Sequence, residues 1–178
     1  MNFLIDGVSC SGKTAVATEL QRRGYHVVHG DRELKYRGDP ATGTAVDVLV
    51  SFPDDQRHAA WIHEHLCWPV EEVEAIVAND EEPVTFFCGG SRNSHMFIHL
   101  FDAVFVLDVD RDTLRRRLDA RPEDDWGGRG RRAERELVLR LHRTKEDVPD
   151  GIVIDATPPL ASVVDEILRQ CGNVEPRG

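Results

Sequence analysis

The stretch FLIDGVSCSGKT, residues 3–14, decides the fold of this chain and lies next to its N-terminus. Its last eight residues match the pattern GxxxxGK[ST] at every fixed position. Such a loop wraps backbone N–H groups around phosphates, so glycine is needed where a Cβ atom would collide with the ligand. Residues 3–5 form an apolar strand before the loop, and residues 13–23 predict a helix that ends at Gly24. This order of strand, loop and helix is the context that the pattern requires.

The residue types of the loop predict its ligands. Lys13 is placed to reach the β- and γ-phosphates of a nucleotide, and the Thr14 hydroxyl is placed to bind Mg²⁺. A plain Gly-Ser turn between a strand and a helix is the alternative, which the strand–loop–helix context disfavours. We therefore expect ATP and Mg²⁺ as cofactors, with nucleotide contacts from Gly7, Ser9, Cys10, Ser11, Gly12, Lys13 and Thr14.

Apolar segments alternate with amphipathic segments along the rest of the chain. Four more strands are expected at 25–28, 83–88, 103–107 and 152–154, and helices at 55–67, 70–78, 110–121, 132–146 and 160–171. Segment 32–53 predicts a loop with a short helix. Five short, almost continuously apolar strands separated by helices predict a five-stranded parallel sheet between two helical layers, an α/β fold of the P-loop NTPase type. Ligands of such sheets lie outside the carboxyl ends of the strands.

Composition limits the classes of partner. The formal net charge is −10, which argues against a general nucleic-acid binder. No apolar run approaches the ~20 residues that span a bilayer, and the first residues lack the features of a signal peptide, so we expect a cytoplasmic protein without a membrane partner. The four cysteines show no CxxC spacing and are interpreted as free thiols. We expect a monomer or a homodimer with one domain over residues 1–171 and a flexible tail over 172–178.

The chain carries neither an NKxD guanine motif nor an LSGGQ-like segment, which leaves the small kinases among P-loop proteins. It resembles the nucleoside/nucleotide-kinase-like P-loop family, which includes adenylate, shikimate and gluconate kinases. The resemblance rests on the loop, on Asp31 after the second strand, on the helix LRRRLDAR at 114–121 and on IDATP at 154–158. Within the family it is most similar to bacterial proteins labelled nucleoside kinase or AAA-type ATPase.

The resemblance implies where ATP and a closing lid lie. Arg117 and Arg121 share one helix face at i and i+4, and in the family these positions contact the adenine and the phosphates. The loop at about 122–131 resembles a short lid that brings arginines to the phosphates and excludes water. A solvated helix face and a plain surface loop are the alternatives. Further candidates are Arg129 and Arg131 in catalysis, and Thr157 and Pro158 against the adenine.

We expect the acceptor to bind between an insert at about residues 32–80 and the ends of two strands. In the family an acid at the position of Asp31 contacts the acceptor hydroxyl or a Mg²⁺-bound water; an N-cap for a following helix is the alternative. Relatives often carry a second acid near the end of the third strand, where this chain has Cys88. The predicted acceptor-binding residues are Asp31, Arg37, Gly89, Gly90, Arg92 and Asn93.

Three functions are compatible with these residues. The first is an ATP-dependent kinase that transfers the γ-phosphoryl group to a hydroxyl or phosphate of a nucleoside or nucleotide. The second keeps the chemistry but uses a sugar acid, a cyclitol or an antibiotic hydroxyl as acceptor. The third is a regulatory ATP-binding module without catalysis. The expected lid arginines together with Asp31 favour phosphoryl transfer.

Overall fold

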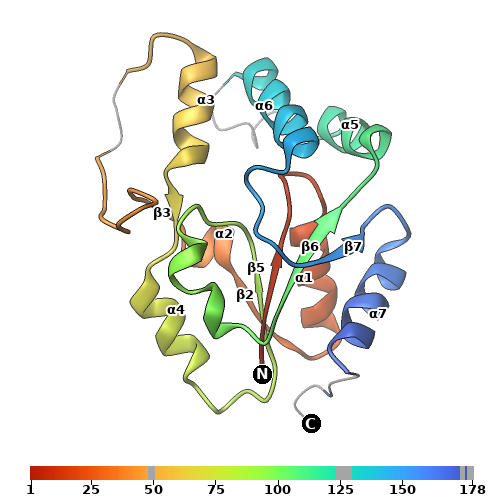
Figure 1. Cartoon of the computed structure of the whole chain (residues 1–178). Helices are drawn as coiled ribbons and strands as arrows, with labels where there is room; N and C mark the ends of the chain where they lie inside the picture. Colours follow the sequence, from red (N-terminus) through yellow and green to blue (C-terminus); the bar gives the residue numbers. More distant parts are fainter. Residues whose placement is uncertain (48–50, 123–129, 173–174, 176–178) are drawn as a thin grey trace.

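The computed structural model describes residues 1–47, 51–122, 130–172 and 175, and its centre is a sheet of five parallel strands (Figure 1). The strand order is β2-β5-β1-β6-β7. These strands are β1 Asn2–Asp6, β2 His26–His29, β5 Thr85–Cys88, β6 Ala103–Asp108 and β7 Ile152–Asp155. The predicted fold class is therefore confirmed, and β1 with its following loop lies at the middle of the sheet.

Helices cover both faces of this sheet. They are α1 Lys13–Arg22, α2 Gly30–Glu33, α3 Asp55–Glu64, α4 Val70–Val77, α5 Arg111–Asp119, α6 Arg131–Thr144 and α7 Leu160–Gln170, with two 3₁₀ turns at Ser94–Met96 and Ile98–Leu100. Aspartates begin two of them: the Asp54 carboxylate accepts from Arg57 N, and the Asp110 carboxylate accepts from Thr113 N at 2.8 Å.

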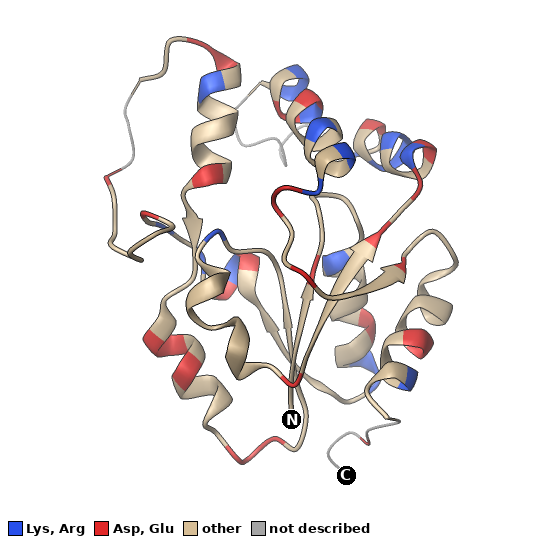
Figure 2. Ribbon diagram, viewed as in Figure 1, with Lys and Arg blue, Asp and Glu red and all other residues tan. Residues whose placement is uncertain are grey.

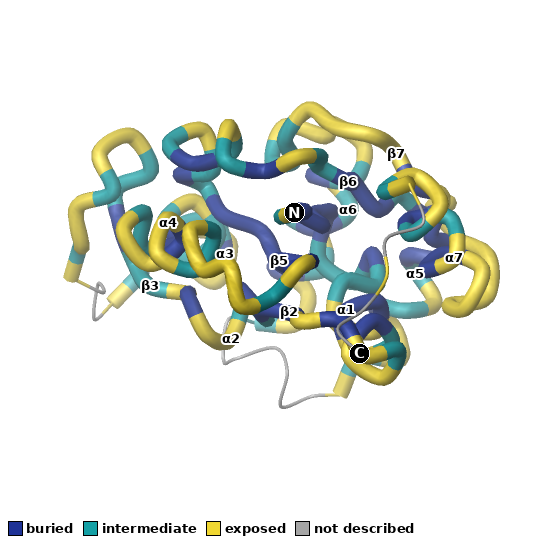
Figure 3. Tube along the Cα trace, turned by 90° about the horizontal axis from the view of Figure 1, so that it is seen from below, coloured by how far each residue is buried: buried dark blue, intermediate teal, exposed yellow. Residues whose placement is uncertain are grey.

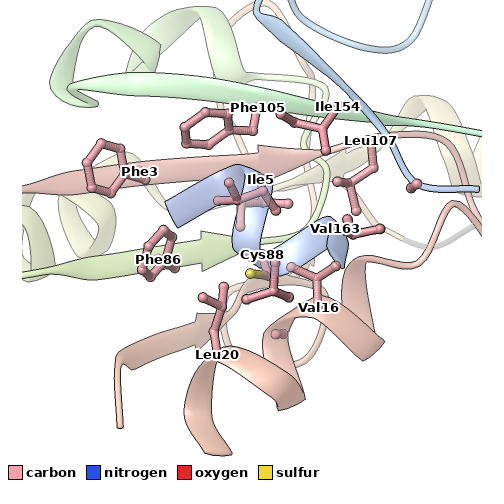
Figure 4. Packing of buried hydrophobic residues seen from close by; sticks show 14 of the residues in the cluster. Phe3, Ile5, Val16, Leu20, Phe86, Cys88, Phe105, Leu107, Ile154 and Val163 are labelled. Carbon is pink, nitrogen blue, oxygen red and sulfur yellow. The ribbon is translucent and has the colours of Figure 1, made fainter. Parts of the chain in front are cut away.

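Alternate side chains of each central strand enter different cores. In β1, Phe3 and Ile5 pack toward α1 and α7, whereas Leu4 packs with Trp68 and Phe97 on the other face. Figure 4 shows the first of these clusters, and Figure 3 shows the buried strands between exposed outer helices. Both faces are apolar because helices cover both, which explains the continuous apolar runs of the sequence.

The segment between β2 and α4 differs from its prediction. Tyr36–Arg37 (β3) pairs antiparallel with Leu66–Cys67 (β4), so α3 ends at Glu64 and does not continue to residue 67. Pairing between segments that are distant in the sequence overrides the helical periodicity there. The resulting arm carries α3 beside α6 and forms one wall above the sheet. Within the described residues, no helix is long and apolar enough to cross a membrane.

Candidate functional site: a phosphate loop between two cavities

The loop between β1 and α1 has the backbone of a phosphate cradle. Gly7 and Gly12 have φ of 149° and 118°, and Cys10 adopts a left-handed φ of 65° that non-glycine residues rarely use. A Cβ atom on Gly7 would lie 2.6 Å from the Leu107 carbonyl oxygen, so only glycine fits there. The Lys13 ammonium lies over the loop, where it donates to the carbonyl oxygens of Gly7 and Val8.

A cavity of about 620 Å³ opens at this loop and is large enough for a nucleotide. Arg117 lines it and joins the loop to the segment after β7, since Nη1 donates to Ser11 O at 2.7 Å and Nη2 to Ala156 O at 2.9 Å. These two bonds fix the plane of the guanidinium at the cavity wall, beside Pro158. All the predicted nucleotide-contacting residues except Gly7 and Thr157 are thus brought together around one cavity.

Thr157, unlike its two neighbours, does not line this cavity. Its hydroxyl accepts from Asp110 N at 3.2 Å, at the start of α5, and its neighbours Ala156 and Pro158 line the cavity in its place. The reason is local: the Asp155 carboxylate accepts from Thr157 N at 2.9 Å and turns the chain, so that alternate residues face the cavity.

The arginines expected in the lid have different positions. Arg121 lines both this cavity and a second one, and Nη1 donates to Glu134 Oε1 at 2.8 Å. Arg131 lines neither cavity, and its guanidinium donates to the Asp119 carbonyl at 3.0 Å, at the start of α6. Arg129 and most of the predicted lid lie outside the described residues. Figure 2 shows acids interleaved with the arginines of α5 and α6.

A second cavity of about 230 Å³ adjoins the first and shares Ser9, Lys13, Asp31 and Arg121 with it. Asp31 lies in α2, whose N-cap is His29, so the capping alternative is wrong. Its carboxylate instead accepts from Gly90 N at 3.1 Å. Asp31 therefore sits at the junction of the two cavities.

The two glycines after β5 are needed for this arrangement. A Cβ on Gly89 would lie 2.8 Å from Asp31 Oδ1, and one on Gly90 would lie 2.8 Å from Asp6 Oδ1. Either contact is closer than carbon and oxygen tolerate, so a side chain there would displace a carboxylate. Gly90 also lines the second cavity.

The remaining predicted acceptor residues divide into two groups. Arg37 and Arg92 line the second cavity, and Arg37 Nη1 donates to Ile62 O at 2.9 Å. Asn93 does not line the second cavity as predicted, because its side chain is fully buried. Its Oδ1 accepts from Trp68 N at 3.0 Å, and its Nδ2 donates to Trp68 O at 2.9 Å. Asn93 fastens the backbone before α4 and does not face the second cavity.

Sequence reasoning missed Asp6, the residue directly before the loop. It is 1% exposed; Oδ1 accepts from Gly7 N at 2.6 Å, and Oδ2 finds no hydrogen-bond partner among the described residues. Burial raises the pKa of Asp6 to about 6, although the nearby charges of Lys13 and Arg92 oppose that rise. The available signal was an acid ending an otherwise apolar buried strand. Asp6 follows Ile5, which pairs with Cys88 at the ends of β1 and β5.

His63 and Asp147 were also missed. They come from α3 and from the segment after α6, and His63 Nε2 lies 3.3 Å from Asp147 Oδ2. Both line the second cavity with Arg92, whose Nη1 donates to the Asp147 carbonyl. No sequence signal could have paired two residues so far apart in the chain.

Oxygen atoms beside the phosphate loop fit Mg²⁺. The predicted ligands Thr14 and Asp31 line the same cavity as the phosphate loop. Among the described residues there is no cluster of three or more His, Cys, Asp or Glu side chains that could hold a metal by themselves. Mg²⁺ does not need one, because it keeps several waters and takes one or two protein oxygens together with nucleotide phosphates.

Comparison with known proteins places this chain in a family. A family model described as an AAA domain matches residues 4–139, which is most of the chain. No curated protein matches it. Among solved structures, a shikimate kinase from Bacteroides thetaiotaomicron aligns with a TM-score of 0.57 and 14% identity, covering 97% of this chain and 98% of that one.

Two further structures have the same fold. A deoxyadenosine kinase from M. mycoides aligns with a TM-score of 0.53 and 13% identity, covering 98% of this chain and 100% of the other. A sugar kinase from Janibacter sp. HTCC2649 aligns with a TM-score of 0.52 and 18% identity, covering 96% of this chain and 94% of the other. At these identities the likeness concerns the fold. The chain belongs to the AAA-domain family matched over residues 4–139 and has the P-loop fold of the nucleoside/nucleotide-kinase-like proteins.

Proposed function

We propose that this protein is an ATP-dependent kinase that transfers the γ-phosphoryl group of ATP to a small acceptor. The observation that carries the proposal is the position of Asp31 and Lys13, which both line the nucleotide-sized cavity and the smaller cavity beside it. A site that only senses ATP needs the first cavity, whereas group transfer needs a second one that meets it at the γ-phosphate.

The phosphate loop, Lys13 and Asp31 have different roles in the proposed reaction. Backbone N–H groups of residues 7–14 hold the phosphates, and Lys13 stabilises the charge that develops on the transferred group. For a hydroxyl acceptor, its oxygen attacks the γ-phosphorus, the bond to the β–γ bridging oxygen breaks, and ADP leaves. Asp31 orients the hydroxyl and takes its proton. Mg²⁺ held by Thr14 and Asp31 would supply further positive charge at the phosphates.

The acceptor class is inferred from the family resemblance and from the size of the second cavity. Resemblance to the family favours a nucleoside or nucleotide, while the sugar kinase and shikimate kinase folds are compatible with hydroxylated acids and sugars. The small volume of the second cavity, about 230 Å³, favours a compact acceptor, because cavities for drug-sized ligands start at about 300 Å³.

The test is ADP release from Mg²⁺-ATP in the presence and absence of candidate acceptors. We expect at least one nucleoside, nucleotide, sugar or hydroxylated acid to increase ADP release, and Lys13→Ala to remove that increase. If ATP binds and no acceptor accelerates ADP release, while ATP changes association with another protein, the regulatory alternative is correct and the proposal is wrong.

A further inference from the structure

We infer that Trp68 is a positioning residue for Asp31. The edge of its indole ring fills a notch between Gly30 and Gly89, and this contact holds the Asp31 carboxylate at the junction of the two cavities. The inference rests on the proposed function, because it explains what keeps the proposed proton acceptor in place. Trp68 itself is fully buried and lines neither cavity, so it contacts neither ATP nor the acceptor.

The six-membered ring of Trp68 lies against the backbone of both glycines. A Cβ atom on Gly30 would overlap Cζ2 of the indole and would lie 2.6 Å from Cε2. A Cβ atom on Gly89 would lie 2.7 Å from the same Cζ2 atom. Neither position has room for a side chain while the ring is there, so the ring and the notch are complementary in shape.

Both glycines adjoin Asp31. Gly30 directly precedes it in α2, and a Cβ atom on Gly89 would lie 2.8 Å from Asp31 Oδ1 and 3.0 Å from Asp31 N. The carboxylate accepts from Gly90 N at 3.1 Å. The helix that carries Asp31 has only four residues. Because so short a helix is not stable by its own hydrogen bonds, its position depends on packing, and Trp68 packs against its first residue.

The rest of Trp68 is fixed in place. Asn93 Oδ1 accepts from Trp68 N at 3.0 Å and Asn93 Nδ2 donates to Trp68 O at 2.9 Å, while the ring stacks on Phe97 with centroids 5.8 Å apart and planes within 3°. Among the described residues the buried Nε1 has no hydrogen-bond partner, which costs free energy. A phenylalanine would fill an apolar core without that cost, but its ring would be too short to reach the notch.

Trp68 also joins two walls of the site. It directly follows β4, which pairs with β3 at the root of the arm, and both strands line the second cavity through Arg37 and Leu66. The same residue therefore borders the acceptor wall and the backbone of Asp31. This contact keeps the carboxylate aligned with the acceptor, and a misplacement of about 1 Å can cost about 10²-fold in rate.

The first test empties the notch. In Trp68→Phe we expect kcat to fall roughly tenfold and KM for ATP to stay within about twofold, measured with the nucleoside, nucleotide, sugar or hydroxylated acid that accelerates ADP release. Trp61→Phe is the matched control, because Trp61 is half-buried on α3, stacks on His65 and lines neither cavity. An unchanged kcat in Trp68→Phe, or an equal loss in Trp61→Phe, would overturn the inference.

Gly30→Ala perturbs the same contact from the side of Asp31, so the test does not depend on the folding of Trp68→Phe alone. The added methyl group clashes with the ring, and kcat should fall at least roughly tenfold. In Gly30→Ala/Trp68→Phe the shorter ring leaves room for the methyl group, so kcat should recover above the Gly30→Ala value. Losses that simply multiply would show that the two residues do not act through their contact.

A double-mutant cycle tests whether Trp68 acts through Asp31. Asp31→Asn should lower kcat about 10²-fold in the wild type, but no more than roughly tenfold in Trp68→Phe, where the carboxylate is already displaced. A residue with a merely structural role would not change the effect of Asp31→Asn. The same 10²-fold loss in both backgrounds would therefore contradict the inference.

Hydrogen exchange measured by NMR tests the contact without catalysis. The Gly90 N–H donates to Asp31, whereas the neighbouring Gly89 N–H donates to Ile5 O at 3.0 Å and reports on the sheet. In Trp68→Phe, exchange at Gly90 should accelerate at least roughly tenfold more than exchange at Gly89. Equal acceleration at both would contradict the inference and leave the proposed kinase intact. Selective acceleration, in a protein that phosphorylates no acceptor, would support the positioning contact and contradict the kinase.

Discussion

The two cavities are built in different ways. The larger one takes nearly half of its lining from one continuous segment, residues 9–16, whose backbone and first helical turn form the cradle. The smaller one is lined by residues of the phosphate loop, of α1, α2, β3, α3, β4 and α6, and of segments between elements, from Gly7 to Asp147. A contiguous motif can preserve the binding of one donor in many proteins. A cavity assembled from distant residues can change its acceptor specificity through single substitutions.

The largest expected effect is on the donor side. Lys13→Ala should lower kcat by at least about 10³-fold, because the transferred group loses its nearest fixed positive charge. The fold should persist, since the Lys13 ammonium bonds only loop carbonyls among the described residues. Steady-state kinetics and circular dichroism measure the two effects. Wild-type turnover in this variant would mean that the loop does not act as a catalytic phosphate cradle.

Asp31 joins the two cavities and should show a different pattern. Asp31→Asn should reduce kcat about 10²-fold and leave KM for ATP nearly unchanged, because the amide can still accept from Gly90 N but cannot take a proton. Glu33→Gln, an exposed neighbour in α2, is the matched control. A fully active Asp31→Asn enzyme would show that the acceptor side is wrongly assigned.

The next effect is on stability and comes from Asp6 beneath the loop. Its folded pKa of about 6 lies above the ordinary value of 3.8, so the native state binds the proton more tightly than the unfolded state does. Asp6 therefore makes the free energy of unfolding fall as pH rises from about 4 to 6, by up to about 3 kcal/mol.

Asp6→Asn removes this titration. The variant should match the wild type near pH 4 and exceed its stability above pH 6, which urea unfolding at several pH values can measure. A constant difference between the two proteins across that range would contradict the buried charge.

The smallest effect concerns the wall of the larger cavity. Arg117→Ala leaves the carbonyls of Ser11 and Ala156 without their donor, so we expect a loss of about 1–3 kcal/mol in unfolding free energy. KM for ATP should rise about tenfold while KM for the acceptor stays constant. Arg116→Ala, on the same helix with its Nη2 donating to Thr113, is the control. A larger change in KM for the acceptor than in KM for ATP would show that the two cavities do not bind the donor and the acceptor separately.

The sequence predicted most of the donor side for a physical reason. Residues 3–14 specify strand, loop and helix locally, and glycine at position 7 is required by the close approach of the Leu107 carbonyl oxygen. The helix face of Arg117 follows from helical spacing. Thr157 does not line the cavity, because a hydrogen bond from its N–H to the Asp155 carboxylate turns the chain there.

The acceptor side depends on long-range pairing, which the sequence does not display. The pairing of β3 with β4 ends α3 early, and it places His63 beside Asp147 and Arg92 from three separate segments. Asn93 was predicted to bind the acceptor from its position after a strand, but its side-chain amide forms two hydrogen bonds with the buried backbone of Trp68. Asp6 was visible in the sequence as an acid in an apolar strand, and its burial between Lys13 and Arg92 could be known only from the fold.

We propose that the γ-phosphoryl group of ATP passes across the junction of the two cavities to a small acceptor. ³¹P NMR of a reaction with Mg²⁺-ATP and each candidate acceptor follows that group directly. We predict a new phosphate monoester or phosphoanhydride signal that grows with ADP and is lost in Lys13→Ala. If the γ-phosphorus of ATP appears only as inorganic phosphate, or stays in ATP with every acceptor, the protein does not transfer it to a small acceptor.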